Sequence, residues 1–165
     1  MELITLLQKE MLQEAATTRK MLARVPAEKF GWQPHPKSMT LQRLSTHVAE
    51  LPGWVTMALT TDELDFESNP YPHNIVKSTG ELLDFFEKSL RDGTASLAQA
   101  DDSTFEKEWV LRNGSQIYSR ESKYEVIRMS FFQTVHHRAQ LGVYLRLLDI
   151  PIPGSYGPSA DDVSF

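Results

Sequence analysis

The stretch FFQTVHHRAQLGVYLR, residues 131–146, most constrains what this chain can fold into. It carries aromatic and aliphatic residues on most sides at helical spacing, which predicts a central, buried helix. Gln133 and His137 are four residues apart, so they share one face about one turn from each other, and Gln140 and Tyr144 continue that line. Burying an unpaired imidazole or amide costs roughly 1–3 kcal/mol per group, so we expect a metal ion, a hydrogen-bonded network or a substrate to hold these side chains.

Apolar residues at helical spacing recur in three earlier segments, which gives four expected helices in all. These helices cover about residues 2–24, 40–60, 78–97 and 121–148. Within the second helix, Pro52 removes one backbone hydrogen bond and should bend the axis. Four helices with one apolar face each predict an all-α fold, a four-helix bundle, in a single domain over residues 1–165.

The connections between these helices are unequal in length. Residues 61–77 are acidic and contain proline, which predicts a long connection and permits a crossover rather than a simple helical hairpin. Asn113-Gly114 is a strong turn signal between two short β-like runs. We therefore expect a short β-hairpin-like excursion before the last helix.

Composition excludes several kinds of function. The formal net charge is −5 and no run of Lys or Arg exceeds two residues, which argues against nucleic acid as a partner. Cysteine is absent, so disulfides, thiolate metal sites and a cysteine nucleophile are excluded and any thiol must come from outside. No apolar run approaches the roughly 20 residues of a membrane span, and the amino terminus does not resemble a signal peptide. A cytoplasmic protein with no membrane partner is the expectation.

A second histidine could complete a site with the last helix. His47 lies beside the core line of the second helix, and Glu50 follows one turn later. Imidazole is a preferred ligand of zinc, nickel and iron, and three ligands with an open position are typical of a catalytic metal. On spacing alone, histidines satisfied within the core are favoured over a metal site by about three to one, because most buried polar groups simply pair.

Two long motifs carry a family resemblance. SMTLQRLSTHVAELPGW, followed much later by TVHHRAQLGVYLRLLDIPIPGSYGPS, resembles the DinB/YfiT-like superfamily of metalloenzymes. The similarity covers most of the chain and includes the W-Q-P loop before the second helix. It implies a four-helix bundle with a divalent metal bound by three histidines at one end of a cleft. His47 matches the family histidine of the second helix, and His137 matches the second of two histidines that lie four residues apart on the last helix.

The first histidine of that pair falls on Gln133, which is a departure from the family pattern. A glutamine carbonyl is neutral and is a poorer ligand for zinc or nickel. Three outcomes follow: Gln133 completes a weaker metal site, Glu50 or another carboxylate replaces it, or the metal is lost and a hydrogen-bonded pocket remains. We favour a retained but weakened site for zinc, nickel, manganese or iron.

Other polar residues have supporting roles in this hypothesis. His136 points about 100° away from His137 around the helix, so we expect it to pack or to support the ligands from outside. Gln140 and Tyr144 could orient a ligand or bound water, and packing is the favoured role for Tyr144. Arg138 should anchor a carboxylate from the first helix or the tail. His35 and His73, both in proline-rich loops, should lie at the surface.

The resemblance implies a metal-dependent enzyme whose relatives are transferases or isomerases that use low-molecular-weight thiols, with metal-assisted hydrolysis in the same group. The expected partner is then a small-molecule substrate, such as a thiol. The alternative is a non-catalytic small-molecule-binding or stress-response protein that has lost the metal. A dimerising scaffold with a structural polar core is a third interpretation, and a homodimer is a reasonable expectation because bundles with apolar helix faces often pair.

Overall fold

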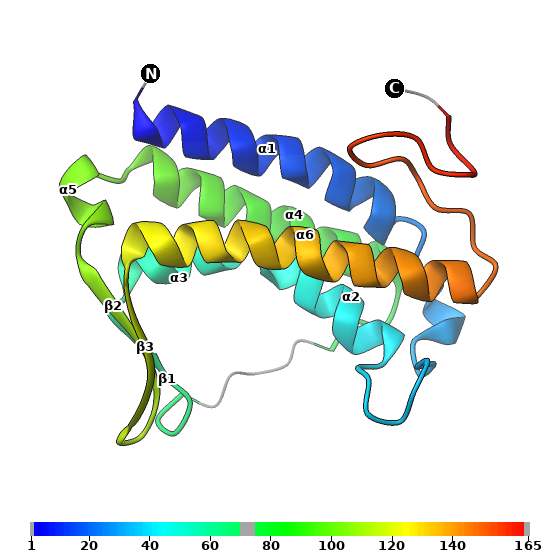
Figure 1. The fold of residues 1–165 in the computed structure, drawn as a ribbon, viewed down its shortest axis with the longest axis horizontal. Helices are drawn as coiled ribbons and strands as arrows, with labels where there is room; N and C mark the ends of the chain where they lie inside the picture. The colour runs from blue at the N-terminus through cyan, green and yellow to red at the C-terminus, as the bar shows by residue number, and fades with distance from the viewer. Residues whose placement is uncertain (1, 70–74, 164–165) are drawn as a thin grey trace.

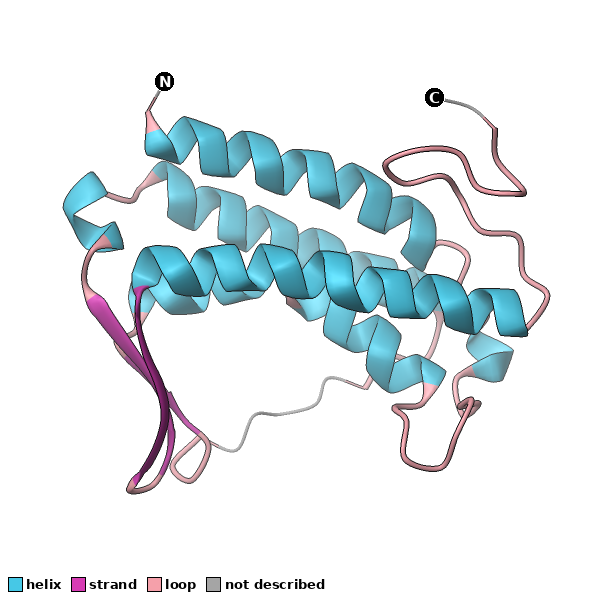
Figure 2. Cartoon of the chain, in the orientation of Figure 1, coloured by secondary structure: helices cyan, strands magenta, loops and turns pink. Residues whose placement is uncertain are grey.

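The computed structural model describes residues 2–69 and 75–163. Most of the chain is helical, and a small three-stranded sheet lies at one end (Figure 2). The helices are α1 (Leu3–Leu22), the 3-10 helix η1 (Ala27–Lys29), α2 (Leu41–Glu50), α3 (Gly53–Thr60), α4 (Thr79–Ala98), α5 (Asp102–Phe105) and α6 (Lys123–Leu147). The strands are β1 (Glu63–Asp65), β2 (Glu108–Asn113) and β3 (Gln116–Ser122).

The three long helices α1, α4 and α6 run alongside one another, and α2 and α3 pack against both α4 and α6 (Figure 1). Each helix turns the apolar residues of its predicted stripe into a shared core. Buried members of this core include Leu7, Met11, Leu44, Val48, Leu82, Phe86, Ile127 and Leu141. The buried positions of these helices follow the helical period, as the spacing of apolar residues predicted.

The second expected helix is interrupted more strongly than predicted. Instead of one bent helix over residues 40–60, α2 ends at Glu50 and α3 begins at Gly53. Thr40 caps α2 by accepting a hydrogen bond from the backbone N–H of Arg43 at 3.2 Å. Pro52 immediately precedes the first residue of α3. Because proline has no backbone N–H, it interrupts the helical hydrogen-bond pattern between α2 and α3.

The chain is mostly helical and the hairpin before the last helix is present, but a third strand, which the prediction did not include, completes a small sheet. Gly114 adopts a φ of +56° in the turn between β2 and β3, which pair antiparallel. Strand β1 then pairs with β2 in parallel, with Leu64 opposite Leu111. The sequence did not predict β1, because three residues show no alternation and the partner strand β2 comes only after α4 along the chain.

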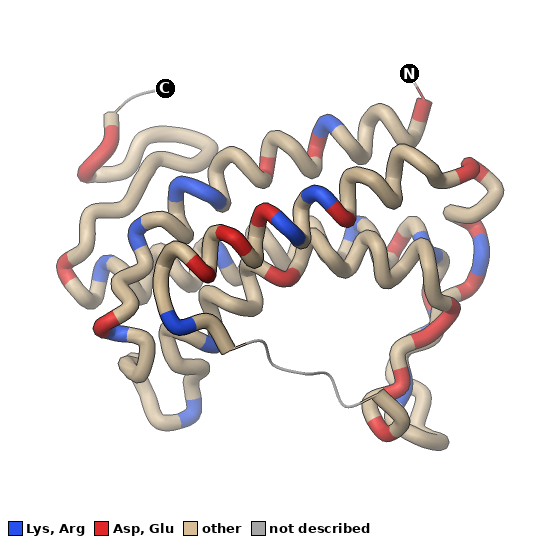
Figure 3. Tube along the Cα trace, turned by 180° about the vertical axis from the view of Figure 1, so that it is seen from behind, with Lys and Arg blue, Asp and Glu red and all other residues tan. Residues whose placement is uncertain are grey.

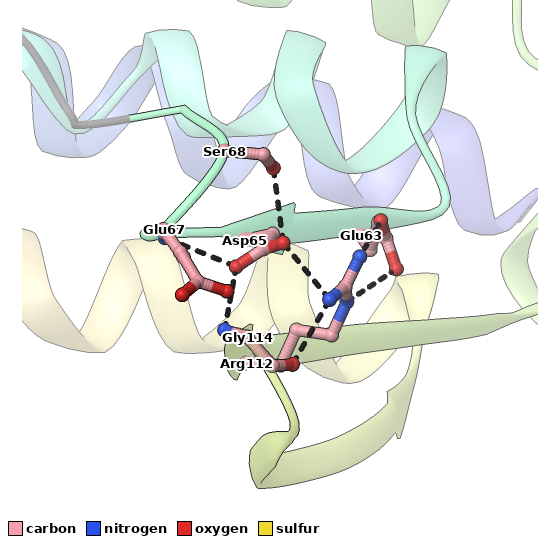
Figure 4. A network of polar contacts seen from close by, with 6 residues as sticks. All are labelled: Glu63, Asp65, Glu67, Ser68, Arg112 and Gly114. Atoms are coloured by element: carbon pink, nitrogen blue, oxygen red, sulfur yellow. Dashed lines mark hydrogen bonds and ion pairs between the residues drawn. The ribbon is translucent and has the colours of Figure 1, made fainter.

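A network around Asp65 holds β1 to the hairpin turn (Figure 4). The Asp65 carboxylate accepts hydrogen bonds from the backbone N–H of Gly114 at 2.9 Å and of Glu67 at 3.0 Å, and from the Ser68 hydroxyl at 3.0 Å. It also pairs with the Arg112 guanidinium at 2.8 Å. The Gly114 N–H is the largest of the influences that hold the pKa of Asp65 below its ordinary value.

The last helix is central but is not buried on all sides. Phe132, Val143 and Leu147 are all more than half exposed, so the predicted central, buried helix is open to solvent along one side. The opposite side of α6 carries Arg138, which pairs with Glu14 of α1 at 2.7 Å and donates to the Tyr156 hydroxyl of the tail at 2.9 Å. The predicted carboxylate anchor for Arg138 is therefore confirmed.

Charged residues of both signs are interspersed along the helices (Figure 3). Several of them form ion pairs, such as Lys88 with Asp92 along α4 and Arg19 of α1 with Glu87 of α4. In the part of the chain that the structure describes, no helix combines the length and the apolar character needed to cross a membrane.

Candidate functional site

The structure brings the histidines of α2 and α6 together. The ring centres of His47 and His137 are 4.6 Å apart and their planes meet at 74°. The His47 side chain is only 14% exposed, and His137 is half-buried. Residues 90 positions apart in the sequence thus place two imidazoles in contact at the junction of two helices, where the packing of α2 on α6 shields them from water.

Each of these imidazoles has an oxygen acceptor at Nδ1. His47 Nδ1 lies 2.5 Å from Glu50 Oε1, and His137 Nδ1 lies 2.9 Å from Gln140 Oε1. Because a carboxylate or an amide oxygen can only accept here, each Nδ1 carries the hydrogen and each Nε2 of the neutral ring is left with a free lone pair. Two neighbouring nitrogen donors therefore remain available to a ligand.

Gln140 also connects His137 to His136. Its amide nitrogen lies 3.1 Å from His136 Nε2, and the two histidine rings are 4.8 Å apart. His136 is exposed, so it stands outside the contact between His47 and His137. Tyr144 donates its hydroxyl hydrogen to the Met39 carbonyl at 3.2 Å and meets Trp32 edge to face at 5.6 Å, which is a packing role.

Glu50 is buried, with 4% exposure, and its two oxygens have unequal surroundings. Oε1 is hydrogen-bonded to His47 Nδ1 and forms an ion pair at 3.5 Å with Arg43 Nη1, an atom that is itself buried without a hydrogen-bond partner among the described residues. Oε2 has no hydrogen-bond partner among the described residues. The ring of Trp54 lies edge to face with His47, at 6.0 Å between centres, and closes this side of the pair.

Burial is the largest influence on His137 and lowers its pKa below the ordinary 6.5. The hydrogen bond to Gln140 opposes this shift, while the nearby His47, His136 and Arg43 reinforce it. The lowered pKa of His137 favours the neutral imidazole at neutral pH, which is the form that can coordinate a metal.

A model of the DinB family matches residues 2–163. The chain belongs to the DinB family. Crystal structures with the same fold include a DinB-like protein from Bacillus cereus, with a TM-score of 0.70, 18% identity, and coverage of 91% of this chain and 95% of that chain. A DinB-like protein from Bacillus subtilis gives a TM-score of 0.67 at 13% identity and covers 88% of this chain and 95% of that chain. At these identities the likeness shows the fold alone. No curated protein matches the sequence.

Gln133 is the residue that the family resemblance predicts as the third ligand. It lies on α6 one turn before His137, is half-buried, and makes no side-chain hydrogen bond within residues 2–69 and 75–163. Across those same residues, no group of three or more His, Asp or Glu side chains is arranged to hold a metal ion. The role of Gln133 as a ligand stays a prediction.

The donors of this DinB-family site nevertheless suit a divalent metal in kind. Two imidazoles lie in contact, and His47 is oriented through Nδ1 by a carboxylate, as is usual for histidine ligands of metals. Only Gln133 or Glu50 could add an oxygen donor from the predicted set. The fit is therefore that of a two-nitrogen site with an oxygen ligand, which binds more weakly than three imidazoles.

Sequence reasoning did not find Arg43 or Trp54. Arg43 precedes His47 by four residues on α2, and Glu50 follows it by three, so the three side chains share one face of the helix. That spacing was a usable signal. Trp54 gave none, because its contact with His47 depends on the break between α2 and α3. Of the two loop histidines, His35 is exposed as expected, and His73 lies outside the described residues.

Proposed function

We propose that this DinB-family chain is a divalent-metal-dependent enzyme in which His47 and His137 bind the ion through Nε2 and Gln133 adds its carbonyl oxygen. The observation that carries the proposal is the 4.6 Å contact between two imidazoles whose Nδ1 atoms are already engaged. In this proposal α1, the α2–α3 pair, α4 and α6 serve as the four helices of a bundle, and the ligands come from two of its members.

The chain's own residues would prepare the site before any ion arrives. Glu50 and Gln140 fix the tautomers and the ring orientations of the two histidines, so little reorganisation is needed. Burial keeps His137 neutral by lowering its pKa. A bound zinc, nickel, manganese or iron ion would supply Lewis acidity that favours the anionic form of a thiol or a water molecule.

The substrate proposed is a low-molecular-weight thiol, transferred to an electrophilic partner. The chain has no cysteine, so the sulfur nucleophile must be supplied from outside. This agrees with a site that offers nitrogen and oxygen ligands and leaves room for an external donor.

A second candidate is a non-catalytic small-molecule-binding protein that has lost the metal. It is favoured by a different observation, namely that no group of three acidic or histidine side chains in the described part of the chain is arranged for a metal. Gln133 in place of histidine is what would have weakened such a site.

Metal titration separates the two candidates. The untagged protein, stripped with a chelator, is titrated with Zn²⁺, Ni²⁺, Mn²⁺ and Fe²⁺ in a calorimeter. We expect one ion per chain, loss of binding in His47→Ala and His137→Ala, and no loss in the exposed control His35→Ala. Gln133→His should tighten binding by at least tenfold, since imidazole is the better ligand. If no ion binds at millimolar concentration, the metalloenzyme proposal is wrong.

Thiol transfer is tested on the metal-loaded protein. Consumption of a low-molecular-weight bacterial thiol is followed in the presence of an electrophile, and His137→Ala serves as the control. Metal-loaded protein that never consumes thiol would contradict the transferase assignment while leaving the metal site intact.

A further inference from the structure

A cavity adjoins the histidine pair at Gln140. It has a volume of about 420 Å³ and lies between α6 and the loop that precedes α2. Its walls are formed by Lys37, Ser38, Met39, Gln140, Val143 and Tyr144. We propose that this cavity binds the carboxylate of a small organic acid, with the Lys37 ammonium as its counter-ion. The step from ligand to substrate rests on the proposed function, whereas the binding itself does not.

The two walls of the cavity are held together by contacts within the protein. The Tyr144 hydroxyl of α6 donates to the Met39 carbonyl of the loop at 3.2 Å. The Tyr144 ring also meets Trp32 edge to face, at 5.6 Å between centres. Within the loop, the backbone N–H of Lys37 donates to His35 Nδ1 at 3.1 Å. The cavity is therefore formed before a ligand enters, so binding requires little ordering of the chain.

Lys37 gives this cavity a positive charge. Among the described residues that line it there is no Asp or Glu, although the chain as a whole has a formal net charge of −5. The Lys37 ammonium forms no ion pair with a carboxylate of residues 2–69 or 75–163, whereas Lys88, for example, pairs with Asp92 at 2.6 Å. A walled space with charge of one sign attracts the opposite charge. The cavity therefore selects an anion.

The uncharged polar groups of the walls are donors as well. Gln140 accepts from His137 Nδ1 through Oε1 and places Nε2 at 3.1 Å from His136 Nε2, which leaves the second N–H of its amide without a partner among the described residues. The Ser38 hydroxyl makes no hydrogen bond within the described part of the chain. Lys37 and Gln140 are exposed, so a ligand in the cavity can reach both. Such a set suits a carboxylate, which only accepts hydrogen bonds.

The size and the remaining wall favour a small acid with a short hydrocarbon body. A volume of about 420 Å³ lies within the range of small-molecule sites, roughly 300–1,000 Å³. Met39 and Val143 supply apolar surface, and Val143 is 58% exposed. One ammonium matches a carboxylate of charge −1 better than a phosphate group, whose charge is about −1.5 to −2 at neutral pH.

Gln140 joins the cavity to the proposed metal site. It follows His137 by three residues on α6, which is about 4.5 Å along the helix axis. Its Oε1 accepts from His137 Nδ1 at 2.9 Å, so the same side chain contacts a proposed ligand and the bound acid. In the proposed function, the cavity thus receives a carboxylate that the substrate carries a few bonds from its reacting atom.

The test uses pentanoate as the probe and pentanamide as its neutral counterpart, on metal-free protein at pH 7 and low salt. Binding is followed by changes in the ¹H–¹⁵N signals of backbone amides. We expect saturable shifts at the amides of Ser38 and Val143 with pentanoate, and an affinity at least threefold higher than that for pentanamide. A smaller ratio, or shifts confined to other parts of the chain, would overturn the proposal.

Two matched variants each remove one exposed lysine from the segment between α1 and α2. Lys37→Gln should weaken pentanoate binding by at least threefold and leave pentanamide binding unchanged, because only the acid uses the charge. Lys29→Gln lies outside the cavity wall and should change the binding of pentanoate by less than twofold. If Lys37→Gln costs less than threefold, or no more than Lys29→Gln, then Lys37 is not the counter-ion.

The outcome is independent of the metal. Pentanoate binding without metal binding would remove the proposed function and keep this inference, and metal binding without pentanoate binding would do the reverse. The substrate step has its own measurement on the metal-loaded protein. There, Lys37→Gln should raise the KM for 3-mercaptopropanoate by at least threefold and leave the KM for 2-mercaptoethanol unchanged. Equal effects on the two thiols would remove the substrate step and keep the binding site.

Discussion

His137 and Arg138 are neighbours on α6, yet their polar groups differ in how fully other protein groups bind them. Arg138 is 2% exposed and contacts Glu14 Oε2 at 2.7 Å, the Thr18 hydroxyl at 3.0 Å and the Tyr156 hydroxyl at 2.9 Å. The group around His137 leaves the Nε2 atoms of both rings and one oxygen of Glu50 without a protein partner among the described residues. The first cluster is saturated from within, and the second has open positions that suit a ligand.

The largest effect is expected at the saturated cluster. Arg138→Ala leaves the Glu14 carboxylate in a mostly buried position without its cation, which should lower the free energy of unfolding by about 3–5 kcal/mol. Urea denaturation followed by circular dichroism measures the change. Lys88→Ala breaks an exposed i, i+4 pair with Asp92 and serves as the control, with an expected cost of about 0.3–0.5 kcal/mol. Similar losses in the two variants would remove the contrast between the clusters.

Glu50→Gln should act on metal binding more than on folding. Loss of the carboxylate that orients a histidine ligand typically weakens metal affinity by about 10–100-fold. The matched change on the other histidine, Gln140→Leu, should cost less than tenfold, because a neutral and exposed group supports His137. Calorimetric titration with Zn²⁺ compares the two. An unchanged affinity in Glu50→Gln would show that Glu50 does not orient a ligand.

A smaller change in stability is expected from Tyr156→Phe. The Tyr156 hydroxyl accepts from Arg138 at 2.9 Å and donates to Glu14 at 2.8 Å, so its removal takes one bridging group out of the saturated cluster. The cost should be about 1 kcal/mol, which is typical of a hydrogen bond that water can partly replace. Thermal unfolding should show this loss without any change in metal affinity. A loss as large as that of Arg138→Ala would mean that the tail, rather than the ion pair, dominates.

The smallest effect is a dependence of stability on pH. The folded-state pKa of His137 lies below the ordinary 6.5, so in acid the unfolded chain binds the proton more readily than the folded chain. This contribution is present above about pH 6.5 and is lost as the pH falls through the folded-state pKa. Urea unfolding between pH 8 and pH 5 should show a weaker decline in His137→Asn than in the wild type, with His35→Asn as the exposed control. An identical decline in all three proteins would contradict this assignment.

The parts of the fold that the sequence predicts are those that depend on local pattern. The stripe through Leu44 and Val48 follows the helical period, and Asn113-Gly114 carries its own turn preference, so both were predictable. Strand β1 was not, because its pairing depends on Asp65 meeting the Gly114 N–H and Arg112 across a long separation in the chain. A three-residue strand has too little pattern of its own to reveal such a partner.

In the candidate site too, contacts within one helix were predictable and contacts between helices were not. Spacing placed Glu50 beside His47 and Gln140 beside His137, because residues three apart on a helix are neighbours. The proximity of His47 to His137 was expected through the family resemblance and not from spacing, since it depends on how α2 packs on α6. The surroundings of the Glu50 carboxylate could not be anticipated in detail, because they depend on how the Arg43 and His47 side chains are oriented around it.

The small sheet has a consequence for the distance between the two histidines. Strand β1 follows α3, and strand β3 leads directly into α6, so the paired strands tie the end of α3 to the start of α6. A slip of β1 against β2 by one residue moves a strand by about 3.3 Å. We therefore expect a substitution that disrupts the hairpin turn to alter the alignment of the two imidazoles, although the turn does not contact them.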